Sequence, residues 1–160
     1  MAESKKRLQF LISLMETKGI SKPELAAIMG KSRQNIFTYF KRDDMKLSFA
    51  QEIAKRLGYN LSFSLESENP AKNNMIVEIE KLVGNESLKR LAFLRLAMSQ
   101  YGIERKAIAE QLGLNYVGVS RWFMVDDIAL SYIFEIAELY GLNVKIKAQV
   151  IENAPSEIKL

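Results

Sequence analysis

The side chains that most often carry out chemistry in proteins are absent from this sequence. Its 160 residues include no cysteine and no histidine, which excludes disulfides, thiolate metal sites and the usual general base. The remaining residues do not assemble a nucleophile next to a base. We therefore do not expect an enzyme, and we expect neither a cofactor nor a metal ion.

Two pairs of acidic residues come nearest to a cation site. Asp43-Asp44 and Asp126-Asp127 carry the carboxylates that hard cations prefer. Neither pair has a glutamate cluster to complete an oxygen cage, and both lie in a bend before a predicted helix. We interpret both pairs as structural turns.

The basic residues are distributed unevenly along the chain. The net charge is +4. Residues 1–69 contain 12 Lys or Arg and 8 Asp or Glu, whereas residues 85–160 contain 9 of each kind. The excess is either a chance feature of a solvated surface or a sign of a polyanionic partner. With such a partner, the first half of the chain would contribute most of the long-range attraction.

An internal repeat organises the chain. With an offset of 83 residues, Glu3–Phe63 aligns with Glu86–Ile146 without a gap, and 22 of the 61 aligned pairs are identical. A unit of this length exceeds the usual solenoid repeat, so we predict a duplicated small domain. The predicted segments are a first repeat over 1–69, a linker over 70–84, a second repeat over 85–153 and a loose tail over 154–160.

No targeting or membrane segment is evident. The sequence has no run of about 18 apolar residues, which is the length needed to cross a bilayer. The N-terminus leads into an amphipathic pattern, whereas a signal peptide would have a hydrophobic block. We expect a cytoplasmic protein that does not contact a membrane.

Apolar residues at helical spacing predict four helices in the first repeat. The first helix spans roughly residues 4–18, with Ser4 as its N-cap. The second begins at about residue 22 behind a capping box of Ser21 and Glu24, and it ends at Gly30. The third begins after its N-cap Ser32 and extends to about Lys41. The fourth begins at a second capping sequence, Ser48 to Gln51, and ends at Gly58.

A β-strand follows the four helices in each repeat. Apolar residues alternate over Asn60–Glu66, with Leu61, Phe63 and Leu65 on one face, and over Asn143–Val150. A lone strand leaves its backbone groups unpaired. The two strands therefore pair antiparallel with each other about a pseudo-two-fold axis, or each pairs with a strand of another chain. Residues 75–83 fit a short helix, which we favour, or a third strand.

The second and third helices of each repeat share a steric pattern. A small residue stands where two steeply crossing helices approach most closely, and a glycine stands in the turn between them. A branched residue and a large apolar residue then lock the third helix in place. The positions are Leu25, Ala26, Gly30, Ile36 and Tyr39 in the first repeat, and Ile108, Ala109, Gly113, Val119 and Trp122 in the second.

This pattern resembles the helix-turn-helix of the Cro and phage-repressor (Xre-like) DNA-binding family, over residues 4–58 and 87–141. The resemblance implies a mainly α fold of two tandem lambda-repressor-like domains, and it implies a transcriptional regulator whose partner is double-stranded DNA. Dimers of this family read two half-sites about one helical turn, roughly 34 Å, apart. Here one chain could read both, and a homodimer with four motifs stays open.

The resemblance also implies that the third helix enters the major groove, where base pairs present distinguishable patterns. In the first repeat, the residues that face away from the core near its start are the expected base readers. They are Ser32, Arg33, Gln34, Phe37, Thr38 and Lys41. The basic residues beside them are suited to phosphates, namely Lys22, Lys31, Arg42 and Lys46. The alternative is that Arg33 and Gln34 are simply exposed polar residues of a surface helix.

The matching residues of the second repeat are less polar. The expected base readers are Asn115, Tyr116, Val117, Ser120 and Arg121, and the expected phosphate ligands are Arg105 and Lys106. Met124 stands in place of Lys41, and Gly118 lies inside the helix. This half either reads DNA with fewer charges, which we favour, or contacts a protein as part of an adaptor or antitoxin-like protein.

The aromatic residues of the third helices could suggest stacking on single-stranded bases. They are Tyr39, Phe40, Trp122 and Phe123. Because they keep register with Ile36 and Val119, we expect core positions instead.

Overall fold

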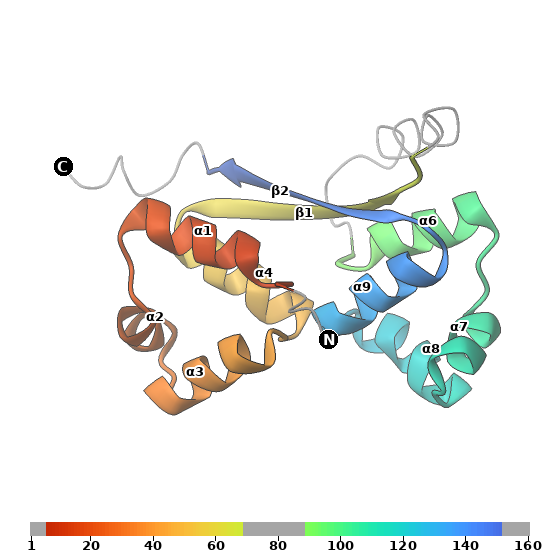
Figure 1. Ribbon diagram of the computed structural model, residues 1–160, viewed down its shortest axis with the longest axis horizontal. Helices are drawn as coiled ribbons and strands as arrows, with labels where there is room; N and C mark the ends of the chain where they lie inside the picture. The colour runs from red at the N-terminus through yellow and green to blue at the C-terminus, as the bar shows by residue number, and fades with distance from the viewer. Residues whose placement is uncertain (1–5, 69–88, 152–160) are drawn as a thin grey trace. The chain divides into compact units, whose positions relative to one another are not determined.

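The computed structural model describes residues 6–68 and 89–151, and it is mainly helical (Figure 1). Four helices and a strand occur in the first half and recur in the second, as the repeat predicts. The first set is α1 (Gln9–Lys18), α2 (Lys22–Met29), α3 (Arg33–Arg42), α4 (Leu47–Arg56) and β1 (Tyr59–Glu66). The second set is α6 (Ala92–Tyr101), α7 (Arg105–Leu112), α8 (Tyr116–Val125), α9 (Leu130–Leu139) and β2 (Asn143–Val150).

Several predictions from the sequence lie outside the described residues. They concern the N-cap at Ser4, the linker over 70–84, the helix or strand over 75–83, and the tail over 154–160. Within 6–68 and 89–151, every helix is too short or too polar to cross a lipid bilayer.

The described residues form two compact units, and the division runs through the strands. Unit 1 comprises residues 6–62, 129–131 and 146–151. Unit 2 comprises residues 63–68, 89–128 and 132–145. Strands β1 and β2 pair in one two-stranded antiparallel sheet, so each unit contains one half of that pairing. The predicted antiparallel pairing of the two strands is therefore confirmed.

The core of each unit comes from the apolar stripes of its helices. In unit 1, α2 packs against α3 and α4, and α1 packs against α4. Leu25, Ile36 and Ile53 are completely buried there. In unit 2, α7 packs against α8, and their equivalents Ile108, Val119 and Ile136 are also completely buried.

The predicted alternation of the strands is confirmed for β1 and only in part for β2. Leu61, Phe63 and Leu65 are buried on one face of β1. In β2, Val144 and Ile146 are half-buried, but Ala148 is exposed and Val150 is 66% exposed. The second half of β2 therefore forms a strand without burying its apolar face.

The start of α2 has the predicted capping box. The Glu24 N–H donates to Ser21 Oγ at 3.2 Å, and the Ser21 N–H donates to Glu24 Oε1 at 2.8 Å. The bond from the Ser21 backbone stabilises the Glu24 carboxylate and lowers its pKa. A lowered pKa stabilises the fold above the ordinary pKa of glutamate, and this contribution is lost as the pH falls through the lowered value.

The turn and the third-helix cap also agree with the sequence. Gly30 ends α2 in the left-handed conformation at φ 68°, which a residue with a side chain rarely adopts. Ser32 Oγ then accepts the Asn35 N–H at 3.0 Å and caps α3.

The predicted cap at Ser48 is wrong, because α4 already begins at Leu47 and Lys46 is its N-cap without a side-chain hydrogen bond. Lys46 instead forms an antiparallel bridge with Ala129, a residue of unit 1. Beside this bridge, the Leu130 N–H donates to the Met45 carbonyl at 2.8 Å, and the Ser131 N–H donates to Asp44 Oδ1 at 2.9 Å. The first amides of α9 are therefore satisfied by residues distant in the sequence.

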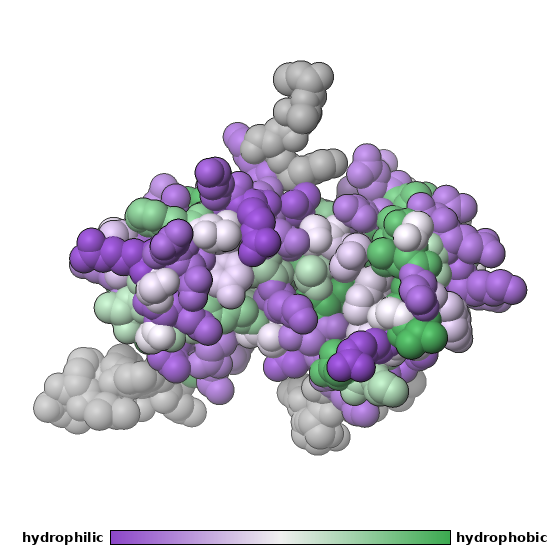
Figure 2. Space-filling view, turned by 90° about the horizontal axis from the view of Figure 1, so that it is seen from below, coloured by the Kyte–Doolittle hydropathy of each residue, from purple (hydrophilic) through white to green (hydrophobic). Residues whose placement is uncertain are grey.

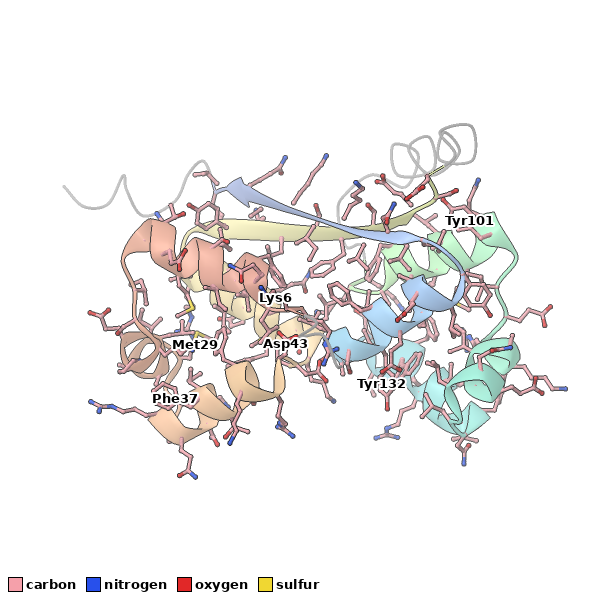
Figure 3. All side chains as sticks on the ribbon, viewed as in Figure 1. Lys6, Met29, Phe37, Asp43, Tyr101 and Tyr132 are labelled. Atoms are coloured by element: carbon pink, nitrogen blue, oxygen red, sulfur yellow. The ribbon has the colours of Figure 1, made fainter. Side chains whose placement is uncertain are left out.

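The predicted start of the first helix at about residue 4 is also wrong, because α1 begins at Gln9. The carboxylate of Asp43 accepts hydrogen bonds from the two backbone N–H groups that precede α1. Asp43 Oδ2 accepts the Arg7 N–H at 2.7 Å, and Asp43 Oδ1 accepts the Leu8 N–H at 2.9 Å. Asp43 itself ends α3 in the left-handed conformation, at φ 58° (Figure 3).

The same arrangement recurs in the second repeat. Asp126 ends α8 at φ 59° and accepts the N–H groups of Arg90 and Leu91 at 2.8 and 3.0 Å. We call this feature of Asp43 and Asp126 the aspartate clasp. It joins the end of the third helix of each repeat to the start of its first helix, and it gives the acidic pairs a structural role.

We predict that Asp43→Ala lowers the free energy of unfolding by about 2 kcal/mol. The partly buried N–H groups of Arg7 and Leu8 lose their carboxylate acceptor, and alanine is strained at a positive φ. Asp43→Asn should lose less, because asparagine keeps one acceptor oxygen and tolerates this conformation. Urea denaturation followed by circular dichroism measures both. Equal unfolding free energies for wild type and Asp43→Ala would contradict the role of the clasp.

We predict that Gly118→Ala raises the free energy of unfolding by about 1 kcal/mol. Gly118 is exposed inside α8, and a Cβ built there meets nothing within 4 Å. Gly113→Ala is the matched control, because Gly113 has φ 68° and alanine should destabilise the turn. Thermal denaturation of both variants measures these effects. A melting temperature of Gly118→Ala below that of the wild type would contradict the predicted stabilisation.

Candidate nucleic-acid interface

The packing of α2 against α3 places the exposed face of α3 on a rigid support. Ala26 is 2% exposed and Ile36 is completely buried, while Gly30 forms the turn between the helices. In the second repeat, Ala109 is 4% exposed, Val119 is completely buried and Gly113 forms the turn. The small, glycine and branched positions of the sequence pattern therefore occupy the places that the steric argument assigned to them.

The six residues predicted to read bases in the first repeat lie together on and just before α3, and all six are exposed. Phe37 is 48% exposed on this helix (Figure 3). Two of the six already make local hydrogen bonds. Ser32 Oγ caps the helix, and Thr38 Oγ1 donates to the Gln34 carbonyl at 2.8 Å. Arg33, Gln34 and Lys41 therefore carry the polar groups best placed to reach a partner.

Sequence reasoning missed Asn35, which is exposed in the first turn of α3 between Gln34 and the buried Ile36. Asparagine can pair with adenine in the same way as glutamine. Its place three residues after the N-cap was visible in the sequence, but the pattern of core positions did not decide which way it faces.

The predicted phosphate ligands of the first repeat fall into two groups. Lys31, Arg42 and Lys46 are exposed. Lys22 is half-buried, and its Nζ lies 5.3 Å from the centre of the Phe40 ring. The equivalent contact recurs in the second repeat, where the Arg105 guanidinium lies 4.4 Å from the centre of the Phe123 ring. Aromatic contacts of this kind attract a cation and fix where it stands.

The matching face of the second repeat is largely apolar. Tyr116 is 52% exposed and Val117 is 71% exposed at the start of α8, and Met124 is 77% and Val125 50% exposed at its end. Figure 2 shows several hydrophobic side chains on the right-hand part of this surface, with hydrophilic side chains between them. Asn115 and Arg121 are exposed and Ser120 is half-buried. Asn115 Oδ1 caps α8 by accepting the Val117 N–H at 2.9 Å.

The outward positions of α3 and α8 therefore differ in chemistry at equivalent places. Arg33, Lys41 and Arg42 of α3 correspond to Tyr116, Met124 and Val125 of α8. Within the helices, α3 has three cationic side chains and α8 has one, Arg121. Sequence reasoning noted Met124 but missed Val125, whose exposure depends on where α8 ends.

The N-terminal end of α8 lies beside a surface depression in unit 2. It is lined by Met98, Ile103, Glu104, Arg105, Lys106 and Tyr116. The two predicted phosphate ligands of this repeat, Arg105 and Lys106, thus lie beside Tyr116, and Lys106 is exposed.

The prediction that the aromatic residues of the third helices are core residues is confirmed only in part. Tyr39 contacts Phe49 with ring centres 5.0 Å apart, and the equivalent rings of Trp122 and Tyr132 are 5.1 Å apart. Phe123 is 5% exposed. Tyr39, Phe40 and Trp122 are half-buried. These rings join the third helix of each repeat to its neighbours.

The aspartates of both acidic pairs accept hydrogen bonds from backbone amides. Asp43 and Asp126 bind backbone amides of the aspartate clasp, and Asp44 binds the Ser131 N–H. Within 6–68 and 89–151, no group of three or more acidic side chains is placed to hold a metal ion.

Comparison with known proteins gives one similarity. The chain is 28% identical over 75 residues to the repressor protein CI of Enterobacteria phage phi80. The match covers 47% of this chain and 30% of that repressor. No protein-family profile matches the chain, and no solved structure matches it. The matched length is shorter than the 83-residue offset of the repeat, so it does not bear on the tandem arrangement. The chain is similar to part of a phage repressor, and this similarity suggests a phage-repressor-like helix-turn-helix protein.

Proposed function

We propose that this protein binds double-stranded DNA sequence-specifically through α3 and α8, each in the major groove, and that it regulates transcription. The observation that carries the proposal is the exposed start of α3, where Arg33 and Gln34 project from a helix held by α2. The similarity to a protein named as a phage repressor supports it. On this proposal the protein is cytoplasmic and acts by binding, without catalysis.

The chemistry of α3 suits base readout. Arginine donates two hydrogen bonds to guanine O6 and N7, and glutamine pairs with adenine N6 and N7. Phe37 is exposed beside them and can contact a thymine methyl group. Lys31, Arg42 and Lys46 are exposed around the helix and suit phosphates, whose contacts set affinity more than sequence preference.

The repeat suggests that a single chain forms a pseudo-dimer. The equivalent strands β1 and β2 pair antiparallel, and Lys46 pairs antiparallel with its own equivalent Ala129. Because α3 and α8 present different side chains, the two half-sites should differ. A homodimer of this chain would carry four such helices.

A second function is supported by the exposed side chains of α8. Exposed hydrophobic residues mark protein-binding surfaces when they cluster, and Val117 and Met124 are the most exposed large hydrophobics of that helix. On this alternative the protein is an adaptor or antitoxin-like protein whose second repeat contacts a protein.

Heparin retention together with a salt-sensitive shift of a labelled duplex separates the DNA-binding function from the adaptor function, because an adaptor should show neither.

Selection of bound duplexes from a random pool tests the pseudo-dimer. We expect an asymmetric site or an imperfect palindrome, with two half-sites about one helical turn apart. Recovery of a perfect palindrome would show that identical helices read both halves, and that result would contradict a monomeric pseudo-dimer.

The division of roles within the first repeat is tested with two variants. Arg33→Ala should weaken binding to the selected site by about 1 to 3 kcal/mol and relax preference at one base pair. Lys31→Ala should weaken binding to all sequences alike and lower the slope of log affinity against log salt by about one unit. Fluorescence anisotropy over a salt series measures both effects. If the two variants behave alike, the assigned roles are wrong.

A further inference from the structure

The first three residues of α8 lack the side chains that read guanine or adenine by paired hydrogen bonds, and Asn115 before them uses its Oδ1 to cap the helix. Tyr116 and Val117 stand where Arg33 and Gln34 stand in α3, and Gly118 stands where Asn35 does. Val117 is 71% exposed and has no polar side-chain atom. A major-groove helix reads base edges mainly with its first residues. Any readout by Val117 must therefore be apolar.

The major groove offers one apolar group, the C5 methyl of thymine. Valine at an exposed position in the first turn suits contact with this methyl. The ring of Tyr116 stands beside it, at the edge of the depression that Ile103 and Arg105 also line. Tyr116 is 52% exposed, so much of its side chain is accessible to a partner.

Gly118 makes a close approach possible. It is exposed, it has no need of the left-handed conformation, and a Cβ added there would meet nothing within 4 Å. Unit 2 therefore has no internal use for a glycine that weakens the helix by about 1 kcal/mol. Because Gly118 has no side chain, the backbone of α8 next to Val117 is uncovered, and a base edge can approach it more closely.

The surroundings favour DNA over a protein partner. Arg121 stands on the outward face between Val117 and Met124, so the exposed apolar residues do not form one unbroken patch. Lys106 is exposed at the start of α7, and Arg105 is held there by its contact with the Phe123 ring. An apolar reader with cations on the same unit suits a groove that has thymine methyl groups on its floor and phosphates along its edges.

We propose that unit 2 reads its half-site through thymine methyl groups contacted by Val117 and Tyr116. This inference rests on the proposed function and specifies the base that this helix prefers. The half-site of unit 2 then contains thymine at the contacted positions, whereas the half-site of unit 1 is read through hydrogen bonds from Arg33 and Gln34.

The test replaces thymine by deoxyuridine, one position at a time, in a duplex selected by the full chain. Deoxyuridine keeps the base pair and removes only the methyl group. We expect one or two positions at which the wild-type protein loses about fourfold in affinity, the value of one buried methyl. In Val117→Ala at least one of these positions should lose most of its sensitivity, and that position is the one whose methyl group Val117 contacts.

Gln34→Ala is the matched control, because it changes the equivalent exposed position of α3. It should weaken binding and keep the full sensitivity of those positions to deoxyuridine. Val117→Ala alters an exposed side chain, and an unchanged melting temperature verifies that both variants fold.

The outcomes separate the inference from the proposed function. If deoxyuridine has no effect at any position, or if every loss persists unchanged in Val117→Ala, the methyl readout by Val117 is overturned while DNA binding stands. Unaltered DNA affinity in Val117→Ala would also overturn it. Absence of salt-sensitive binding to any duplex would overturn the proposed function and this inference with it.

Discussion

The aspartate clasp is the constraint on which each repeat depends. The third helix must end abruptly, and the chain must then turn towards the fourth helix. Asp43 makes this turn in the left-handed conformation, and its carboxylate simultaneously binds the Arg7 and Leu8 amides ahead of α1. One side chain thus stops α3 and fixes the start of α1. Because an isolated helix of ten residues is marginal in water, such tertiary anchoring decides whether α3 keeps its orientation.

The clasp also explains why α3 and α8 tolerate different outward faces. Their inner faces are fixed by Ile36 and Val119, both completely buried, and their ends are fixed by Asp43 and Asp126. Apart from the N-caps Ser32 and Asn115, the outward residues make few contacts that hold the fold, so their chemistry can change at little cost to stability. This separates the residues that determine the scaffold from those that a partner would meet.

The sequence predicted the helices, the turn glycines, the capping box and the alternation of β1 because each depends on local spacing. Ser21 and Glu24 are three residues apart, and the bonds between them follow from that spacing. It did not predict the starts of α1 and α4. Asp43 binds amides 35 and 36 residues away, and Lys46 pairs with Ala129, so both helix starts depend on contacts between segments far apart in the chain.

The residues of the candidate site likewise divide into those whose exposure follows from local spacing and those whose position depends on tertiary packing. Exposure of Arg33, Gln34 and Lys41 follows from the period of the helix once Ile36 is assigned to the core. The exposure of Val125 does not, because it depends on the last turn of α8, which Asp126 ends by tertiary contact. The position of Arg105 over the Phe123 ring also requires the packing of α7 on α8. Periodicity therefore identifies which side chains face outward, whereas packing decides where they are held.

The inequality of the two outward faces has a physical consequence under the proposed function. Coulombic attraction acts over about a Debye length, roughly 8 Å at physiological salt. The attraction between a side chain and a methyl group acts only at van der Waals contact. The three cations of α3 would then dominate the encounter with DNA, and the apolar start of α8 would act after alignment. A symmetric homodimer presents the same face twice and cannot distinguish the two directions of its site. A chain with one cationic and one apolar reader can, because exchanging its half-sites would place each reader opposite the wrong base pairs.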